Sequence, residues 1–287
     1  MRSKFSKTAF MASVLLALAF TISCSSDDSG GKEVISTRLM TYVIYDANGG
    51  ITSSAEYRYE YDYNANGSMR TSETYIKNTM GNFYKYNTTE YDSKGNPKGV
   101  SYNTDGSIIG RSELEYDSRG NQTKQVSYNA DGSILAKYEY EYEYDSRGNQ
   151  TKLVSYNADG STSRVEYSCN SDGSYCTYNS YNKDGEIAST GEVRYITINS
   201  KRLTASQSSG TTKIEYEYDS NGNTTKSTTY SRQTEGSSYE QTSSSKIEYK
   251  YDSNGNIIKS TSYSWQKDTG NYVKYSETTY ILTYKRL

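Results

Sequence analysis

The chain has 287 residues, a formal net charge of −2 and a hydrophobic content of 33%, below the roughly 45–50% of ordinary soluble domains. Because it contains 34 tyrosines but only 4 phenylalanines and 1 tryptophan, tyrosine must supply much of any core, which favours a thin or half-wet sheet. The charge gives no electrostatic footprint for nucleic acid, and the absence of histidine excludes Ser-His-Asp and Cys-His nucleophile pairs and His-ligated zinc.

The first residues, "MRSKFSKTAFMASVLLALAFTISC", have the pattern of a secretory signal: a basic start, an apolar run and small residues before Cys24. A plain signal peptide and an N-terminal transmembrane anchor are the alternatives. The segment resembles a bacterial lipoprotein signal, with Thr-Ile-Ser at the lipobox positions, although Thr21 replaces the preferred leucine. The resemblance implies removal of residues 1–23, lipid modification of Cys24 and a location at the outer membrane or cell surface.

A polar stretch, "SSDDSGG", follows Cys24. Its charge and glycine ending predict a flexible tether over residues 24–38, between the lipid and a folded part. The membrane is therefore an expected partner, reached through the N-terminal lipid. Acidic residues just after the lipidated cysteine also resemble the surface-export signals of some bacterial lipoproteins.

A five-residue pattern, Tyr-(Asp or Asn)-x-x-Gly, recurs along the rest of the chain. It begins at residues 45, 63, 91, 102, 116, 128, 144, 156, 181, 218 and 251, and at 169 with Cys in place of Tyr. An Asx residue, two turn formers and a glycine favour a three-residue hairpin loop with a bulge. We therefore predict an all-β fold: an antiparallel β-meander of repeated hairpins that forms an extended or curled repeat sheet, with hairpin loops at 129–133 and 145–149.

The residue two after each glycine should pair with the turn tyrosine, and side chains alternate between faces along a strand. The intervals between these positions are mostly even, which predicts one aromatic face (Ile134, Ala136, Tyr138, Tyr140, Tyr142 and Tyr144; likewise Ile51 and alternate residues to Tyr63) and one charged face. The odd intervals, 97–102 and 162–169, predict bulges. The same register predicts Lys152 opposite Tyr142, with Lys226 and Lys259 placed likewise, their stems along tyrosine rings.

The repeats span 39–203 and resume over 212–287, so the composition of 204–211 predicts a break or kink between two parts of one β-repeat. "YEYDSRGN" and "YEYDSNGN" are similar to the YD repeat of RHS-type bacterial surface and toxin proteins. The similarity covers most of residues 42–287, although Asn follows the glycine at 96, 121, 149, 223 and 256 where the familiar repeat has Arg-Leu. The resemblance implies repeat architecture and an extracellular setting, and no toxin or protease activity.

Cys169 and Cys176 flank one of the turns, and export would permit a disulfide between them. A two-residue turn at Asp172-Gly173 would place the two cysteines directly opposite each other. The turn shared with the other repeats would instead pair Cys169 with Tyr175. The sequence leaves both arrangements open.

Residues 62–73 match the spacing of a calcium-binding loop, but the flanking segments alternate like strands, whereas that loop needs helices. We therefore predict no metal site and no cofactor. Carboxylates are abundant, as a two-carboxylate glycosidase would require, but nothing distinguishes any pair of them. We predict a protein that is not an enzyme.

Exposed aromatic side chains are the remaining candidates for a binding site. Trp265, Tyr138, Tyr140 and Tyr142 could stack on sugar rings, although the same residues could simply form the core. The sequence therefore predicts a cell-envelope lipoprotein with a non-catalytic binding role towards a glycan or surface protein, or an adhesive role. The alternatives are a purely structural spacer and a glycan-acting enzyme.

Overall fold

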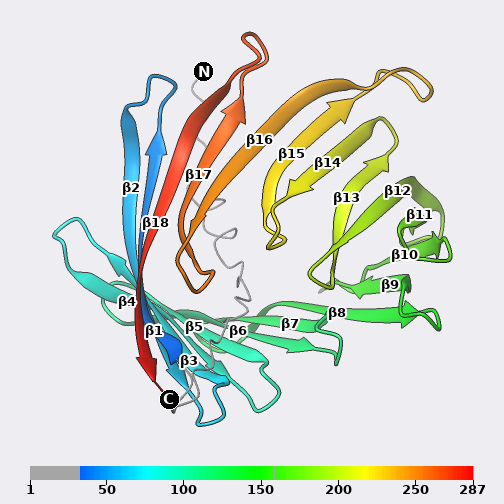
Figure 1. Ribbon diagram of the computed structural model, residues 1–287. Helices are drawn as coiled ribbons and strands as arrows, with labels where there is room; N and C mark the ends of the chain where they lie inside the picture. Colours follow the sequence, from blue (N-terminus) through cyan, green and yellow to red (C-terminus); the bar gives the residue numbers. More distant parts are fainter. Residues whose placement is uncertain (1–32, 158, 287) are drawn as a thin grey trace, which may run out of the picture.

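The computed structural model describes residues 33–157 and 159–286, so the signal segment, Cys24 and most of the expected tether lie outside the described residues. Eighteen β-strands make up its regular structure (Figure 1). In chain order they are β1 (Glu33–Tyr45), β2 (Ile51–Tyr63), β3 (Met69–Lys77), β4 (Phe83–Tyr91), β5 (Pro97–Tyr102), β6 (Ile108–Tyr116), β7 (Gln122–Asn129), β8 (Ile134–Tyr144), β9 (Gln150–Tyr156), β10 (Thr162–Cys169), β11 (Tyr175–Tyr181), β12 (Ile187–Ile198), β13 (Lys201–Ser209), β14 (Thr212–Tyr218), β15 (Thr224–Ser231), β16 (Glu240–Tyr251), β17 (Ile257–Trp265) and β18 (Tyr272–Arg286). Among the described residues, no helix has the length and apolar character needed to span a membrane.

The strands form one antiparallel sheet that closes on itself. Every strand pairs with the next one along the chain, and β1 pairs with both β2 and β18. Glu33 at the start of β1 lies opposite Arg286 at the end of β18. The predicted all-β antiparallel meander is confirmed, and its curled form is a closed barrel without a free edge strand.

Two segment boundaries differ from the sequence expectation. Strand β1 begins at Glu33, so residues 33–38 belong to the sheet and not to the tether. Strand β13 covers most of the expected break at 204–211 and pairs with β12 and β14. Serine and threonine are compatible with a strand whose ladder is satisfied on both sides, so the local composition did not produce a break.

The repeated turns have the predicted geometry. In the loop from Asn129 to Ser133, the Gly132 amide donates to the Asn129 carbonyl at 3.0 Å and the Asn129 amide to the Ser133 carbonyl at 2.9 Å. The loop from Asp145 to Asn149 repeats both bonds. Gly132 has φ of 87°, a conformation that costs other residues roughly 1–2 kcal/mol and explains the fixed glycine.

A one-residue register shift beside the turn changes which residues share a face. In the β8–β9 hairpin Tyr144 pairs with Gln150 as predicted, but Glu143 pairs with Lys152, which leaves Thr151 without a partner. Because directly opposite residues share a face, Gln150 and Lys152 point to opposite sides of the sheet. Lys152 therefore lies opposite Glu143, and the predicted pairing with Tyr142 is wrong.

The same shift corrects the other predicted lysine contacts and two members of the aromatic face. Lys226 pairs with Glu217, and Lys259 pairs with Lys250, so neither faces a tyrosine in register. Ile51 pairs with Tyr45 and Ile134 with Tyr128, which places both isoleucines on the charged face. Tyr138, Tyr140 and Tyr142 do share the opposite face, as predicted.

The strands with odd intervals turn out to lack the shift. The β4–β5 and β9–β10 pairings run without interruption from Tyr91 opposite Pro97 and from Tyr156 opposite Thr162. The bulges expected within 97–102 and 162–169 are therefore absent. A strand with an odd interval and no shift places its two ends on opposite faces of the sheet. A strand with an even interval and one shift does the same. The turn tyrosines therefore keep alternating between the two faces along the chain.

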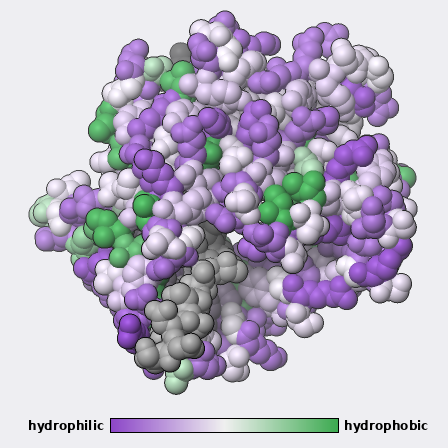
Figure 2. All heavy atoms as spheres, viewed as in Figure 1, coloured by the Kyte–Doolittle hydropathy of each residue, from purple (hydrophilic) through white to green (hydrophobic). Residues whose placement is uncertain are grey.

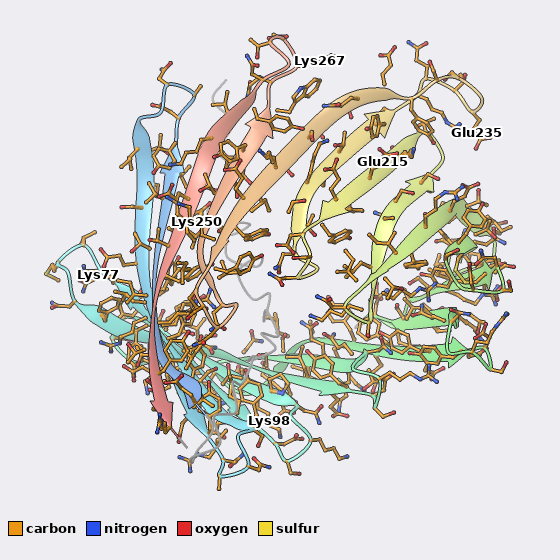
Figure 3. All side chains as sticks on the ribbon, in the orientation of Figure 1. Lys77, Lys98, Glu215, Glu235, Lys250 and Lys267 are labelled. Atoms are coloured by element: carbon orange, nitrogen blue, oxygen red, sulfur yellow. A yellow bond between two sulfur atoms is a disulfide. The ribbon has the colours of Figure 1, made fainter. Side chains whose placement is uncertain are left out.

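The tyrosine face lines the inside of the closed sheet and the charged face lies outside. Lys77 and Lys98 of the charged face point away from the enclosed space in Figure 3, and polar residues cover most of the surface visible in Figure 2. Few side chains are fully buried; Val34 and Cys176 have relative exposures of 0% and 1%. The sheet thus has two partly covered faces and no single dry core.

The barrel has two ends, which differ in the chemistry of their turns. At the N-terminal rim, where β1 begins and β18 ends, lie the turns that follow even-numbered strands, such as "DSRGN" at 117–121 and 145–149. At the far rim lie the turns that follow odd-numbered strands, such as "NADGS" at 129–133 and 157–161. The turn tyrosine lies on the inner face at the N-terminal rim and on the outer face at the far rim.

Candidate functional site

Half-buried aromatic rings inside the barrel surround Arg38, where β18, β1 and β2 meet. The Arg38 guanidinium carbon lies 3.8 Å from the centre of the Tyr280 ring and 5.8 Å from that of Tyr59. Burial raises the pKa of Tyr59 and of Tyr61, and the nearby charge of Arg38 offsets part of each rise. This group is a cation–π cluster at the seam of the sheet.

Other inner tyrosines use their hydroxyls within the protein. Tyr63 donates to the Ile35 carbonyl at 2.8 Å, and Tyr142 donates to the Gln122 carbonyl at 2.9 Å. Tyr249 donates likewise to the Thr224 carbonyl at 3.1 Å. These bonds hold the rings against the sheet, so this part of the tyrosine face acts as the core of the barrel.

The four aromatic residues considered for ligand stacking are not brought together. Tyr138, Tyr140 and Tyr142 lie in a row on the inner face of β8, and each is half-buried. Trp265 ends β17 at the far rim and pairs with Tyr272, whose hydroxyl lies 2.8 Å from that of Ser244 on the outer face. The wall of the barrel therefore separates Trp265 from the inner row.

The outer face is held by charged pairs across neighbouring strands. Lys152 Nζ lies 2.7 Å from Glu143, and Lys226 Nζ lies 2.8 Å from Glu217. The outward turn tyrosines add to this pattern, since the Tyr156 hydroxyl lies 3.1 Å from Glu141. Exposed pairs of this kind contribute about 0–1 kcal/mol each, so their main effect is a hydrated outer surface of mixed charge.

Carboxyl groups of the described residues show a single direction of pKa shift. Wherever a shift is resolved, a hydrogen bond or a nearby cation keeps the aspartate or glutamate pKa below its usual value, as Lys85 and Tyr75 do at Glu73. The general acid of a glycosidase requires a raised pKa. Among residues 33–157 and 159–286, no three side chains of His, Cys, Asp or Glu are grouped to hold a metal ion.

The calcium-loop match at 62–73 has its two carboxylates already paired with cations. Asp62 forms an ion pair with Arg70, and Glu73 lies 2.5 Å from Lys85 Nζ. Asp62 pairs in register with Thr71, and Glu73 with Glu60. The residues are spread along two strands and do not converge on one point.

Cys169 and Cys176 are directly opposite each other and form a disulfide, with Cα atoms 4.0 Å apart. Neither turn considered from the sequence produces this pairing. The loop keeps the bond from the Gly173 amide to the Asn170 carbonyl, but the Asn170 amide donates to Tyr175, one residue further than in the other repeats. Ser174 is thus an extra loop residue, and it brings the cysteines into register.

The N-terminal rim contains a repeated hydrogen-bonded group that the sequence reasoning missed. Tyr284 donates to the Asp252 carboxylate at 2.6 Å, and Asn256 Nδ2 lies 2.8 Å from the Tyr284 hydroxyl. The same arrangement joins Tyr251 to Asp219 and Asn223. The asparagine after the turn glycine, noted as a departure from the YD repeat, was the available signal, because the combination Tyr-Asp-x-x-Gly-Asn recurs in turns of this rim.

Arginines extend this network from one turn to the next. Arg147 donates to the Ser171 carbonyl at 2.6 Å, and Arg202 donates to the Gly173 carbonyl at 2.6 Å. Arg202 also lies 3.7 Å from the centre of the Tyr195 ring and 3.6 Å from the Cys176 sulfur. The N-terminal rim is therefore tied together by its own side chains.

No family model and no curated protein matches the chain. Among solved structures, a porin-like protein from Bacteroides uniformis is 12% identical, over 87% of this chain and 98% of that one, with a TM-score of 0.45. A chain of the TcdB2-TccC3-Cdc42 complex is 11% identical over 88% of this chain, with a TM-score of 0.28. A chain of the Photorhabdus luminescens Tc holotoxin pore is 12% identical over 88% of this chain, with a TM-score of 0.25. This chain spans 16% of each toxin chain, and at these TM-scores the likeness carries no functional conclusion.

Proposed function

We propose that the chain is a lipid-anchored protein of the bacterial cell envelope with a non-catalytic binding role. The observation that carries this proposal is the closure of the sheet with its tyrosine face inside and its charged face outside. The inner hydroxyls are engaged in holding the wall, so the barrel offers its outer face and its rims to other molecules. The lowered pKa values of the carboxyl groups support a role without acid–base catalysis.

The anchor is proposed at Cys24, from the sequence pattern alone. Two or more acyl chains would give stable membrane attachment where a single chain would be marginal. Metabolic palmitate labelling should mark the wild-type protein and disappear in Cys24→Ala. A mature N-terminus at another residue, without lipid, would refute the assigned location.

A glycan is the first ligand class to test, because Trp265 and Tyr272 are adjacent aromatic residues at the outer edge of the far rim. Binding to envelope polysaccharides on a glycan array should weaken in Trp265→Ala. The row Tyr138, Tyr140 and Tyr142 is accessible only from within the barrel, so Tyr140→Ala is the matched test of an inner site. An array signal that neither variant changes would remove the aromatic residues from the binding site.

A purely structural role is the second candidate, and a specific observation favours it. The tyrosine face is enclosed by the curvature of the sheet, and its best-defined hydroxyls bind backbone carbonyls. A spacer predicts no ligand in glycan or protein screens and an envelope defect on deletion. Rescue of that defect by a lipid-anchored β-barrel of unrelated sequence would favour the spacer over the binding role.

A further inference from the structure

The far rim carries an exposed aliphatic ring. It consists of Ile51, Met80, Ile109, Ile134, Leu135 and Ile187, with relative exposures of 67%, 81%, 48%, 61%, 65% and 57%. These six belong to turns, or to the first residues after turns, that follow β1, β3, β5, β7 and β11. Repeated exposure at one end of a barrel differs from the scattered exposed aliphatics of ordinary surfaces, and it marks an interaction site.

The matching positions at the other end show that this ring is specific to the far rim. Ile134 and Leu135 are the second and third residues after Gly132. At the N-terminal rim the equivalent residues after Gly120 and Gly148 are Gln122-Thr123 and Gln150-Thr151, which are half-buried and polar, and those after Gly255 are Ile257-Ile258, which are aliphatic but half-buried. At these positions after the turns, aliphatic residues are exposed at the far rim, whereas the N-terminal rim has polar residues or half-buried isoleucines.

Acidic side chains alternate with the aliphatic ring. The far-rim turns contain eight acidic residues (Asp46, Asp105, Asp131, Asp159, Asp184, Glu186, Glu235 and Asp268) and three basic residues (Lys183, Arg232 and Lys267). Asp131 and Asp159 are exposed, and each accepts hydrogen bonds from the serine two residues later through Oδ1. These bonds keep the pKa of both carboxyls low, so both are ionised at neutral pH.

Two shallow hollows open on the outer face beside this rim. One, of about 250 Å³, is bordered by Glu56, Lys77 and Gly81. The other, of about 360 Å³, lies between Tyr156 and Tyr181 and includes Lys152, Arg164 and Lys183. The first hollow can receive a side chain of a partner that docks across the end of the barrel, and the cations of the second would select against a basic side chain there.

We infer that the far rim is a docking surface for another protein whose contact surface presents aliphatic and basic side chains. The aliphatic ring supplies apolar contact area, and the acidic turns select a basic partner. An anionic lipid surface would meet the acidic turns with like charge, and a second copy of the chain in rim-to-rim contact would do the same.

The orientation of this surface rests on the proposed lipid anchor. Residues 1–32 join the described chain at Glu33, which lies at the N-terminal rim. Strand β1 has 13 residues and so extends about 43 Å at roughly 3.3 Å per residue. An anchor at Cys24 would therefore leave the far rim pointing away from the membrane, where a protein partner can reach it.

The first experiment places a photo-crosslinking amino acid at Leu135 or, as a matched control, at Thr123 of the full-length protein in intact cells. The proposal expects a protein adduct from position 135 that is at least ten times stronger than any from position 123. Equal adducts from both rims, adducts only with a second copy or with lipid, or no adduct would each overturn it. Palmitate labelling of the same cells separates the two proposals, because loss of label refutes the anchor and leaves the adduct result to decide the docking surface.

The second experiment measures binding of the purified crosslinked partner to the purified protein. Ile134→Ser with Leu135→Ser should weaken binding at least tenfold, and Asp131→Asn with Asp159→Asn should weaken it and reduce its dependence on salt. The matched control, Gln150→Ser with Thr151→Ser at the N-terminal rim, should leave affinity within twofold. Circular dichroism of each variant checks the fold, and a partner that binds all variants equally would contradict the inference.

Discussion

At the scale of single residues, the asparagine that follows the turn glycine has a defined structural role. Asn256 contacts both the Asp252 carboxylate and the Tyr284 hydroxyl. These three side chains hold the end of β18 against the turn between β16 and β17. Bonds that involve a carboxylate are stronger than neutral ones. This explains why the motif keeps Tyr, Asp and Asn together in the turns of one rim.

Tyr284→Phe should lower the free energy of unfolding by about 1–2 kcal/mol, because it leaves Asp252 without one charge-assisted donor. Urea denaturation followed by circular dichroism is the measurement. Tyr263→Phe is the matched control, since its hydroxyl lies 3.0 Å from an exposed carboxylate, Glu248, and should cost less than about 0.5 kcal/mol. Equal losses in the two variants would show that the rim group has no special weight.

The same carboxylates predict a loss of stability in acid. Burial alone would raise the pKa of Asp219 and Asp252, but hydrogen bonds from Tyr251, from Tyr284 and from the turns outweigh it, and both pKa values lie below the usual range. A lowered folded-state pKa stabilises the protein above the unfolded-state value, near 3.9, and this contribution is lost as the pH falls through the folded-state pKa.

We therefore expect the urea midpoint to be nearly constant from pH 7 to about pH 5 and to fall below about pH 4. Asp252→Asn should make the midpoint fall less steeply in acid, because the asparagine side chain does not titrate and its contribution is the same at every pH. A midpoint that rises in acid would contradict the assignment.

At the scale of elements, the turns and the inner row of β8 could be predicted from the sequence because both depend on local rules. The Asx-x-x-Gly loop fixes its own hydrogen bonds, and strand alternation then places Tyr138, Tyr140 and Tyr142 on one face. The face of Ile134 and the partner of Lys152 were wrong because a bulge beside the turn adds one unpaired residue. No residue type at Thr151 or Leu135 signals that bulge.

Two glycines allow the cost of a steric clash to be compared with the cost of a positive φ. Gly191 is tightly packed between strands. A Cβ there would lie 2.1 Å from the Ser208 carbonyl oxygen and 2.5 Å from the Tyr178 ring, so Gly191→Ala must displace both the β12–β13 ladder and the ring. We expect a loss of more than about 2 kcal/mol in urea unfolding. Gly132→Ala is the control, because Gly132 has open space but a positive φ and should cost about 1 kcal/mol. The reverse order would contradict the packing described here.

At the scale of the whole molecule, closure of the sheet could not be predicted, because it depends on where the two ends of the chain meet. Nothing in β1 or β18 alone identifies the other as its partner, and the Arg38 cluster that joins them consists of residues far apart in the sequence. The two chemically different rims were in principle visible, because "DSRGN" and "NADGS" alternate along the repeat. Their separation to opposite ends follows from the meander alone.

Closure around tyrosine also predicts a limit to stability in alkali. Burial raises the pKa of Tyr63 and of Tyr249 to about 12, against about 10 in an unfolded chain. A raised folded-state pKa stabilises the protein fully below pH ~10, and this contribution is lost as the pH rises through ~12. Between pH ~10 and ~12, tyrosinate absorbance should therefore increase while the β-sheet circular dichroism signal decreases. Full ionisation of the tyrosines with an intact β signal would contradict the inner placement.

The near-identity of the repeats predicts that the barrel tolerates removal of a complete unit. Deleting residues 116–143 joins Glu115 to Tyr144 and recreates the local sequence of the β6 turn, with β9 replacing β7. The deletion removes one turn from each rim and two strands, so antiparallel order and the alternation of faces are kept. We expect a monomeric protein with a sixteen-stranded sheet, judged by size-exclusion chromatography and circular dichroism.

Deletion of β18 alone is the matched control for this experiment. It removes both the β1–β18 and β17–β18 pairings and leaves β1 and β17 with long unpaired edges, which recruit strands of other molecules. That variant should aggregate or fail to accumulate, although it loses fewer residues than the unit deletion. A soluble, monomeric protein without β18, or an insoluble one after removal of the complete unit, would mean that closure is not what stabilises this sheet.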